Sequence, residues 1–221
     1  MDVIENLSSA FRYASEGLVG KWMRWIILII ASIIFPLIIG YSLRIMKGVV
    51  PAPETDDYLG MFIDGIKVII INIVYMIIPV VIGCILFFLS GGFGALTMLG
   101  MDVANPGAYV GLLLGSLGVS MIAFIILAFI FSLFEIIGVI RFARSGAMGD
   151  AFAFSDILAT IGKMGWVTYI IALIVFGIVV FVIYMILSLI PIIGWLLTLI
   201  IAPYLSIVGA RYYSLLYDAG V

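Results

Sequence analysis

The sequence predicts an all-α, polytopic membrane protein, and two observations predict it. First, 66% of the 221 residues are hydrophobic, 10% are charged and the mean hydropathy is +1.41. A soluble domain has about 25% charged residues. Second, the charges are separated by uncharged runs at 25–43, 68–101, 103–134 and 164–210. A helix needs about 20 apolar residues to cross about 30 Å of hydrocarbon, so these runs are long enough to span a bilayer.

The last three runs predict four transmembrane helices. The second and third runs hold one span each, and the fourth holds two spans with a turn near Pro191. The spans are expected at 68–90, 108–140, 165–190 and 192–212. We expect the whole chain, 1–221, to form a single integral membrane domain.

The basic residues predict which way the spans face. The ten Lys and Arg residues are Arg12, Lys21, Arg24, Arg44, Lys47, Lys67, Arg141, Arg144, Lys163 and Arg211. The loops 44–67 and 141–163 contain most of the charges, whereas 91–107 has no basic residue. Short loops rich in Lys and Arg face the cytoplasm. We therefore expect a multi-pass protein of the cell membrane with a cytoplasmic C-terminus.

The first hydrophobic run, 25–43, allows two topologies. As a straight helix its 19 residues would measure about 28 Å, just enough to cross and give five transmembrane helices. Crossing would leave Arg12, Lys21 and Arg24 outside. Proline breaks the helical hydrogen-bond pattern, so Pro36 favours a broken or re-entrant segment with its turn near Ile33 to Pro36. That topology gives four crossings and a cytoplasmic N-terminus, and we expect it.

Amphipathic helices are expected beside the membrane. Residues 1–20 place Ile4, Leu7, Phe11, Ala14 and Leu18 at helical spacing on one face, as in a helix that lies in the interface. A similar pattern precedes later spans, with Asp57 as the expected cap of one helix. The stretches 10–25 and 151–166 align with one gap, which suggests an internal repeat.

Several ordered motifs resemble a known family. They are Gly40-Tyr41-Ser42-Leu43-Arg44, Pro53-Glu54, Asp57, Asp64-Gly65-Ile66-Lys67, Arg141-Phe142-Ala143-Arg144, Phe152 to Leu158 and Ile190 to Trp195. This order resembles domain-of-unknown-function family 4013, a group of archaeal and bacterial multi-pass membrane proteins. The resemblance implies a polytopic membrane protein and implies no reaction. The glycine-rich segment 91–107 departs from the family pattern.

Glu135 is the main candidate for an intramembrane charge. It lies between apolar residues inside a predicted span, where an ionisable side chain is costly and often functional. No cation stands three or four positions after it, so its partner must come from another helix. Arg44 and Arg211 are expected near the same depth and are the candidate partners. A structural ion pair, a proton or cation site, and snorkelling to the interface are the alternatives.

Two further groups of residues are candidates for contacts. Gly107, Gly111 and Gly115 form a small-xxx-small register, which is typical of close helix packing within a chain or between copies. A set of basic residues near the predicted membrane surface is expected to contact anionic lipid headgroups, each worth about 1 kcal/mol. This set is Lys21, Arg24, Lys67, Arg141, Arg144 and Lys163.

The sequence favours a non-enzymatic function. It has no histidine and no nucleotide-binding loop, zinc motif or nucleophile elbow. We expect no catalytic residue, metal, cofactor or nucleic-acid partner. The leading hypothesis is a membrane scaffold that interacts with lipids, with other membrane proteins or with further copies of itself. The alternative is a small transporter or channel for an ion or small solute, suggested by the broken segment and by Glu135.

Overall fold

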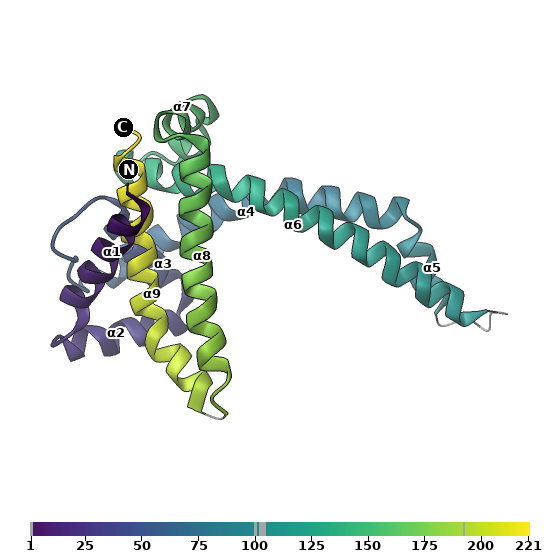
Figure 1. Cartoon of the computed structure of the whole chain (residues 1–221), viewed down its shortest axis with the longest axis horizontal. Helices are drawn as coiled ribbons and strands as arrows, with labels where there is room; N and C mark the ends of the chain where they lie inside the picture. The colour runs from purple at the N-terminus through teal and green to yellow at the C-terminus, as the bar shows by residue number, and fades with distance from the viewer. Residues whose placement is uncertain (1, 100, 102–104, 192) are drawn as a thin grey trace. The chain divides into compact units, whose positions relative to one another are not determined.

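The structure is a computed structural model that describes residues 2–99, 101, 105–191 and 193–221. These residues form nine α-helices and one 3-10 helix and contain no strand (Figure 1). The all-α prediction is therefore confirmed. The chain divides into two compact units, unit 1 (Met1–Ile71 and Ile136–Val221) and unit 2 (Asn72–Glu135).

Four helices are long and apolar enough to cross a membrane, as predicted. They are α4 (Tyr58–Leu89), α6 (Pro106–Ser145), α8 (Trp166–Ser188) and α9 (Ile193–Asp218). Two of them extend well beyond the expected spans. The helix expected after Asp57 continues through Lys67 without a break into α4, and the Asp57 carboxylate accepts a hydrogen bond from the Gly60 N–H at 3.0 Å.

The first hydrophobic segment is broken where the sequence predicts. It forms α2 (Trp22–Ile33) and α3 (Phe35–Met46), which are separated at Ile34. Pro36 lies in the first turn of α3. Backbone N–H groups in a first turn have no hydrogen-bond acceptor within the helix, so the N–H that proline lacks is not needed there. Each helix has 12 residues and is about 18 Å long, so neither can cross about 30 Å of hydrocarbon alone.

The first helix, α1 (Val3–Leu18), packs along α9. The Asp2 carboxylate caps it by accepting hydrogen bonds from the N–H groups of Ile4 and Glu5 at 2.9 and 3.2 Å. Its buried face contains Ala10, Tyr13, Ala14, Gly17 and Leu18, whereas Ile4 from the expected apolar face is 74% exposed. Ala10 and Ala14 are small residues on this buried face, and a Cβ at Gly17 would lie 3.0 Å from the Ala52 Cβ.

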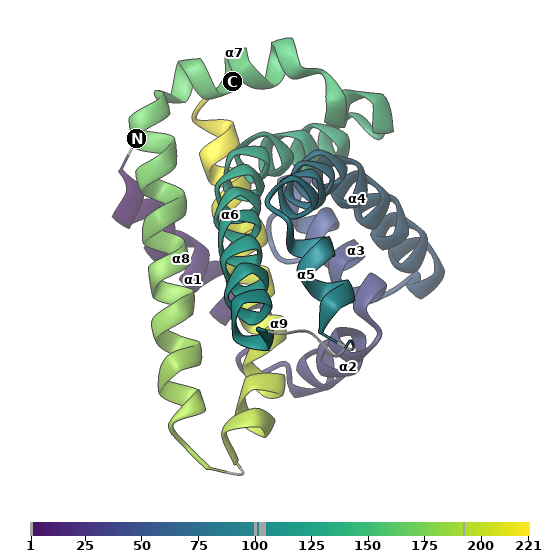
Figure 2. The ribbon, with the colours of Figure 1, turned by 90° about the vertical axis from the view of Figure 1, so that its right-hand side faces the viewer.

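Helix α9 is the centre of unit 1, because α1, α2, α3, α7 and α8 all contact it. α8 and α9 form an antiparallel hairpin, and α7 (Phe154–Met164) lies across the end of α8 after the 3-10 helix η1 (Met148–Phe152) (Figures 1 and 2). Gly165, with a φ of 85°, allows the sharp turn from α7 into α8. Both chain termini lie at the α7 end of unit 1, and the α8–α9 turn lies at the other end (Figures 1 and 2).

Two glycines bring α3 and α4 into backbone contact inside unit 1. A Cβ atom at Gly40 would lie 1.8 Å from the Met61 carbonyl oxygen, and one at Gly65 would lie 1.8 Å from the Pro36 carbonyl oxygen. Real Cβ atoms never approach an oxygen so closely, so both positions require glycine. Both glycines belong to the motifs that carry the family resemblance.

Unit 2 consists of the adjoining parts of α4 and α6 together with α5 (Gly92–Met98). The Ser116 hydroxyl donates to the Ser90 carbonyl at 2.9 Å. Gly83 of α4 faces α6, where a Cβ would be in ordinary van der Waals contact with the Phe124 Cβ at 3.6 Å. A stacked pair of rings, Phe88 and Phe93, joins α4 to α5 with centroids 4.7 Å apart.

Candidate functional site

Charged and polar contacts in unit 1 join the two ends of the first hydrophobic segment. The Arg24 guanidinium forms an ion pair with Glu54 and donates to the Gly17 carbonyl at 3.2 Å. The Tyr13 hydroxyl donates to the Val49 carbonyl at 2.8 Å. The chain just before the segment therefore contacts the chain just after it, as a re-entrant hairpin requires.

The Arg24 pair is asymmetric in its exposure. The Arg24 side chain is only 7% exposed, whereas that of Glu54 is 76% exposed. Hydrogen bonding to Arg24 and the positive charge of Arg24 lower the pKa of the Glu54 carboxyl below its usual value. Glu54 therefore stays ionised and neutralises a guanidinium that the fold has removed from water.

Arg44 binds the acidic end of the same loop. Its guanidinium lies 3.2 Å from the Asp56 carboxylate and 3.0 Å from the Asp57 carboxylate, and it also donates to both backbone carbonyls. Four acceptors thus surround one guanidinium, which fixes the loop between α3 and α4. Sequence reasoning missed these partners, although three acids within four positions were a visible signal.

Most of the predicted lipid-headgroup residues form ion pairs inside the protein. Arg141 pairs with Asp156 at 2.6 Å, Arg144 with Asp218 at 2.6 Å and Lys67 with Asp64 at 3.1 Å. Arg144 also donates to the Met46 carbonyl and the Ser214 hydroxyl, both at 2.9 Å. In the described part of the chain, Lys21 and Lys163 form no ion pair and are exposed. A headgroup role for the six stays a prediction, and it fits these two lysines best.

The connection between α1 and α2 lies beside α9. Tyr13 faces Arg211, the Ser15 hydroxyl lies 2.9 Å from the Tyr204 hydroxyl, and the Trp25 indole donates to the Ile200 carbonyl at 2.9 Å. Successive residues along α1 and α2 thus contact progressively earlier residues of α9. α1 therefore runs antiparallel to a helix that is long enough to cross the membrane. The expected position of α1 in the membrane interface stays a prediction.

Arg211 differs from the other arginines on the spanning helices. Its guanidinium lies over the Tyr13 ring, 5.0 Å from the centroid. Its Nε is buried and has no hydrogen-bond partner among the described residues. No carboxylate in the described part of the chain lies within ion-pair distance of Arg211.

Glu135 is half-buried on α6. It belongs to unit 2, whereas Arg44 and Arg211 belong to unit 1. The pair that the sequence suggests between Glu135 and one of these arginines stays a prediction.

The glycine register of α6 faces open space within the chain. A Cβ at Gly111 or Gly115 would meet no atom within 4 Å, and one at Gly107 would meet only the Asn105 side chain at 3.7 Å. The contact of α6 with α4 uses Ser116 and Ser120 instead. The predicted contact between copies through these glycines remains untested.

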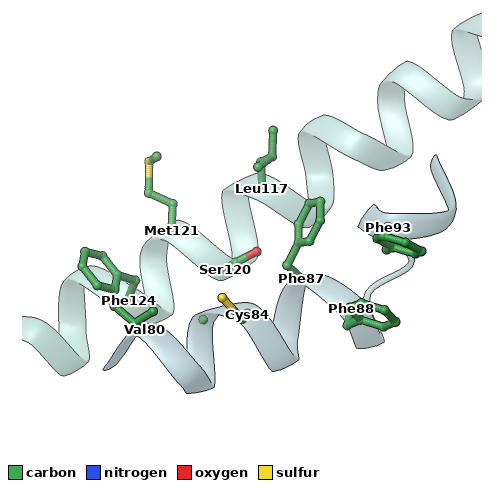
Figure 3. A pocket seen from close by; sticks show the side chains of 10 residues that line it. Val80, Cys84, Phe87, Phe88, Phe93, Leu117, Ser120, Met121 and Phe124 are labelled. Carbon is green, nitrogen blue, oxygen red and sulfur yellow. The ribbon is translucent and has the colours of Figure 1, made fainter. Parts of the chain in front are cut away.

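Unit 2 has an apolar groove of about 550 Å³ between α4, α5 and α6 (Figure 3). Four of its ten lining residues are aromatic, namely Phe87, Phe88, Phe93 and Phe124, and Cys84 also lines it. The one nearby hydroxyl, that of Ser120, donates to the Ser116 carbonyl. None of the described lining residues is charged.

The described residues contain no cluster of side chains that could bind a metal ion. No three His, Cys, Asp or Glu side chains come close enough there to hold a metal ion. Five acids of unit 1 instead bind arginines: Glu54, Asp56, Asp57, Asp156 and Asp218. What the arrangement can do is hold a broken hydrophobic segment in place and present a few unpaired cations.

The comparisons with known proteins point to one family. No curated protein and no solved structure matches the chain. The model of the family described as "Protein of unknown function (DUF4013)" matches residues 25–192, which is more than half of the chain. This match confirms the resemblance that the ordered motifs indicate. It runs from the broken segment through α8 and includes the loop that binds Arg24 and Arg44. The chain belongs to the DUF4013 family of proteins of unknown function.

Proposed function

We propose that this protein is a non-enzymatic membrane scaffold that interacts with lipids or partner proteins, with its charged face in the cytoplasm. One observation carries the proposal: four of the six arginines of unit 1 are held in structural ion pairs, whereas the spanning helices turn mostly apolar side chains outward. In the most apolar stretches of α8 and α6, only 17% and 22% of the residues are buried. Such helices offer large surfaces to lipid or to other membrane helices.

The topology that we propose places both termini in the cytoplasm. The contacts of Arg24 with Glu54 and of Tyr13 with Val49 support a first segment that enters and leaves on one side. Both termini also lie at the same end of unit 1 (Figures 1 and 2). The basic residues between 141 and 163 support a cytoplasmic position for that end.

Labelling of Ser8→Cys in a Cys84→Ser background tests this topology. Ser8 is exposed, so a thiol there is reachable from whichever side α1 faces. We expect an impermeant maleimide to label it only after intact cells are permeabilised. Thr97→Cys, in the expected outer segment, and Ser155→Cys, in the expected cytoplasmic loop, are controls because both positions are exposed. Labelling of Ser8→Cys in intact cells would contradict the proposed cytoplasmic N-terminus.

The second candidate is a small transporter or channel, favoured by the broken first segment and the half-buried Glu135. Discontinuous helices and intramembrane carboxylates occur in many transporters. Purified protein in liposomes separates the two functions. For a scaffold we expect background flux of protons, monovalent cations and small solutes, both with and without Glu135→Gln. Flux well above that of empty liposomes, abolished by Glu135→Gln, would establish the transporter instead.

A further inference from the structure

Arg211 is a half-buried cation without a carboxylate. The arginines of unit 1 at 24, 44, 141 and 144 each form an ion pair with an Asp or Glu. The Arg211 guanidinium instead lies over the Tyr13 ring, 5.0 Å from the centroid. A cation–π contact stabilises a guanidinium but brings no negative charge. Burial raises the pKa of the Tyr13 hydroxyl to about 12, although Arg211 lowers it, so Tyr13 stays neutral and cannot supply the charge.

The geometry leaves part of this guanidinium available. Only Nε is sealed from the surroundings, and neither terminal nitrogen of Arg211 donates a hydrogen bond among the described residues. Arg211 lies near the C-terminal end of α9, and Arg12, next to Tyr13 on α1, is exposed and forms no ion pair in the described part of the chain. Arg211 therefore lies at the α1–α9 contact without a carboxylate partner among the described residues, whereas Arg12 is a cation on the exposed side of α1.

We propose that Arg211, held against the Tyr13 ring, binds a phosphate group between α1 and α9. The planar guanidinium matches the oxygens of a phosphate, which can accept two parallel N–H hydrogen bonds. At the proposed cytoplasmic surface, anionic lipid headgroups are the abundant source, and a free phosphate group would use the same contacts. This site deepens the proposed function, on which it rests, because it names where a lipid headgroup is recognised.

Lipid titration of purified protein in nanodiscs of neutral phosphatidylcholine tests the site. The probes are short-chain phosphatidic acid, phosphatidylglycerol, phosphatidylcholine and inorganic phosphate, and binding is read by native mass spectrometry. We expect the two anionic lipids to bind and phosphatidylcholine not to bind. Arg211→Gln should weaken that binding at least about tenfold, because it removes charge-assisted hydrogen bonds. Binding of inorganic phosphate with equal or greater affinity would assign the site to free phosphate instead of lipid.

Arg12→Gln is the matched control, because it removes an arginine charge from the exposed side of α1, one position before Tyr13, and leaves the guanidinium on Tyr13 in place. We expect it to weaken binding less than about threefold, as for a screened surface charge. Equal losses for Arg12→Gln and Arg211→Gln, or no loss for Arg211→Gln, would overturn the site. If Arg211→Gln does not fold, Arg211→Lys replaces it: a lysine keeps the charge but not the planar fork, and undiminished binding would also overturn the site. The two tests fail independently. Flux in liposomes would contradict the scaffold function and would leave the lipid-binding result unchanged. Unchanged lipid binding by Arg211→Gln would contradict the phosphate site and would say nothing about flux.

Discussion

Gly65→Ala is expected to destabilise the protein severely, because its new Cβ would lie 1.8 Å from the Pro36 carbonyl oxygen. The obstacle is backbone, so it cannot rotate away as a side chain could. α3 and α4 must separate, and the packing of the broken first segment is lost with them. Overpacking of a tight contact costs about 3 kcal/mol, which corresponds to a fall in Tm of about 6–12 °C for a protein of this size. Thermal unfolding in detergent, followed by circular dichroism, measures it. Gly40→Ala should act in the same way through Met61.

The same substitution elsewhere in the chain gives the control. Gly111 and Gly115 are helical and exposed, and a Cβ at either would meet no atom within 4 Å. Alanine stabilises a helix interior relative to glycine by about 0.5–1 kcal/mol. Gly111→Ala and Gly115→Ala should therefore leave Tm unchanged or raise it. If the Tm of Gly65→Ala equalled that of Gly111→Ala and Gly115→Ala, the close contact of α3 and α4 would be contradicted.

The features that the sequence predicts well are local ones. The length of each uncharged run determines whether a helix can cross a membrane, and no tertiary contact changes that length. The break at Ile34 is predicted for the same reason, since Pro36 acts on its own helix. Helix ends are less well predicted. α6 begins at Pro106 and ends at Ser145, beyond the expected 108–140, because charged residues near a helix end do not stop the helix.

The choice of partner for each charge could not be predicted from the sequence. Asp56 and Asp57 bind Arg44, and its predicted pair with Glu135 stays a prediction. The path of the loop that contains these two acids is a tertiary property. Spacing along one helix offers no information about such a path. The glycines at 40 and 65 show the same limit, since only the crossing of two helices makes them necessary.

The internal repeat stays a prediction, although the two aligned stretches share a local design. In each, an amphipathic helix ends at a short break before an apolar helix, α1 before α2 and α7 before α8. The apolar helices differ in length, with 12 residues in α2 and 23 in α8. Any shared origin has therefore left one apolar helix broken and the other continuous.

Glu54→Gln is expected to lower Tm clearly, because it leaves the Arg24 guanidinium, which is 7% exposed, without its anion. An unpaired buried charge destabilises a fold more than the loss of both partners does. The double variant Arg24→Met with Glu54→Gln should therefore melt above Glu54→Gln alone, which a double-mutant cycle in thermal unfolding measures. A double variant that melts lower than either single variant would contradict a paired role.

The dependence on pH gives an independent test of the same pair. The pKa of Glu54 is lowered from the ordinary value of 4.5, mainly by hydrogen bonding to Arg24. A lowered pKa means that the pair stabilises the folded protein fully above about pH 4.5, and that this stabilisation is lost as the pH falls through the folded-state pKa. The difference in Tm between the wild type and Glu54→Gln should therefore be constant from pH 8 to about pH 6 and shrink below about pH 4.5. A difference that stays constant into that acidic range would show that charge is not what holds Glu54 to Arg24. The two ends of the first hydrophobic segment would then be held by packing, such as that of Gly17 against Ala52, and not by their ion pair.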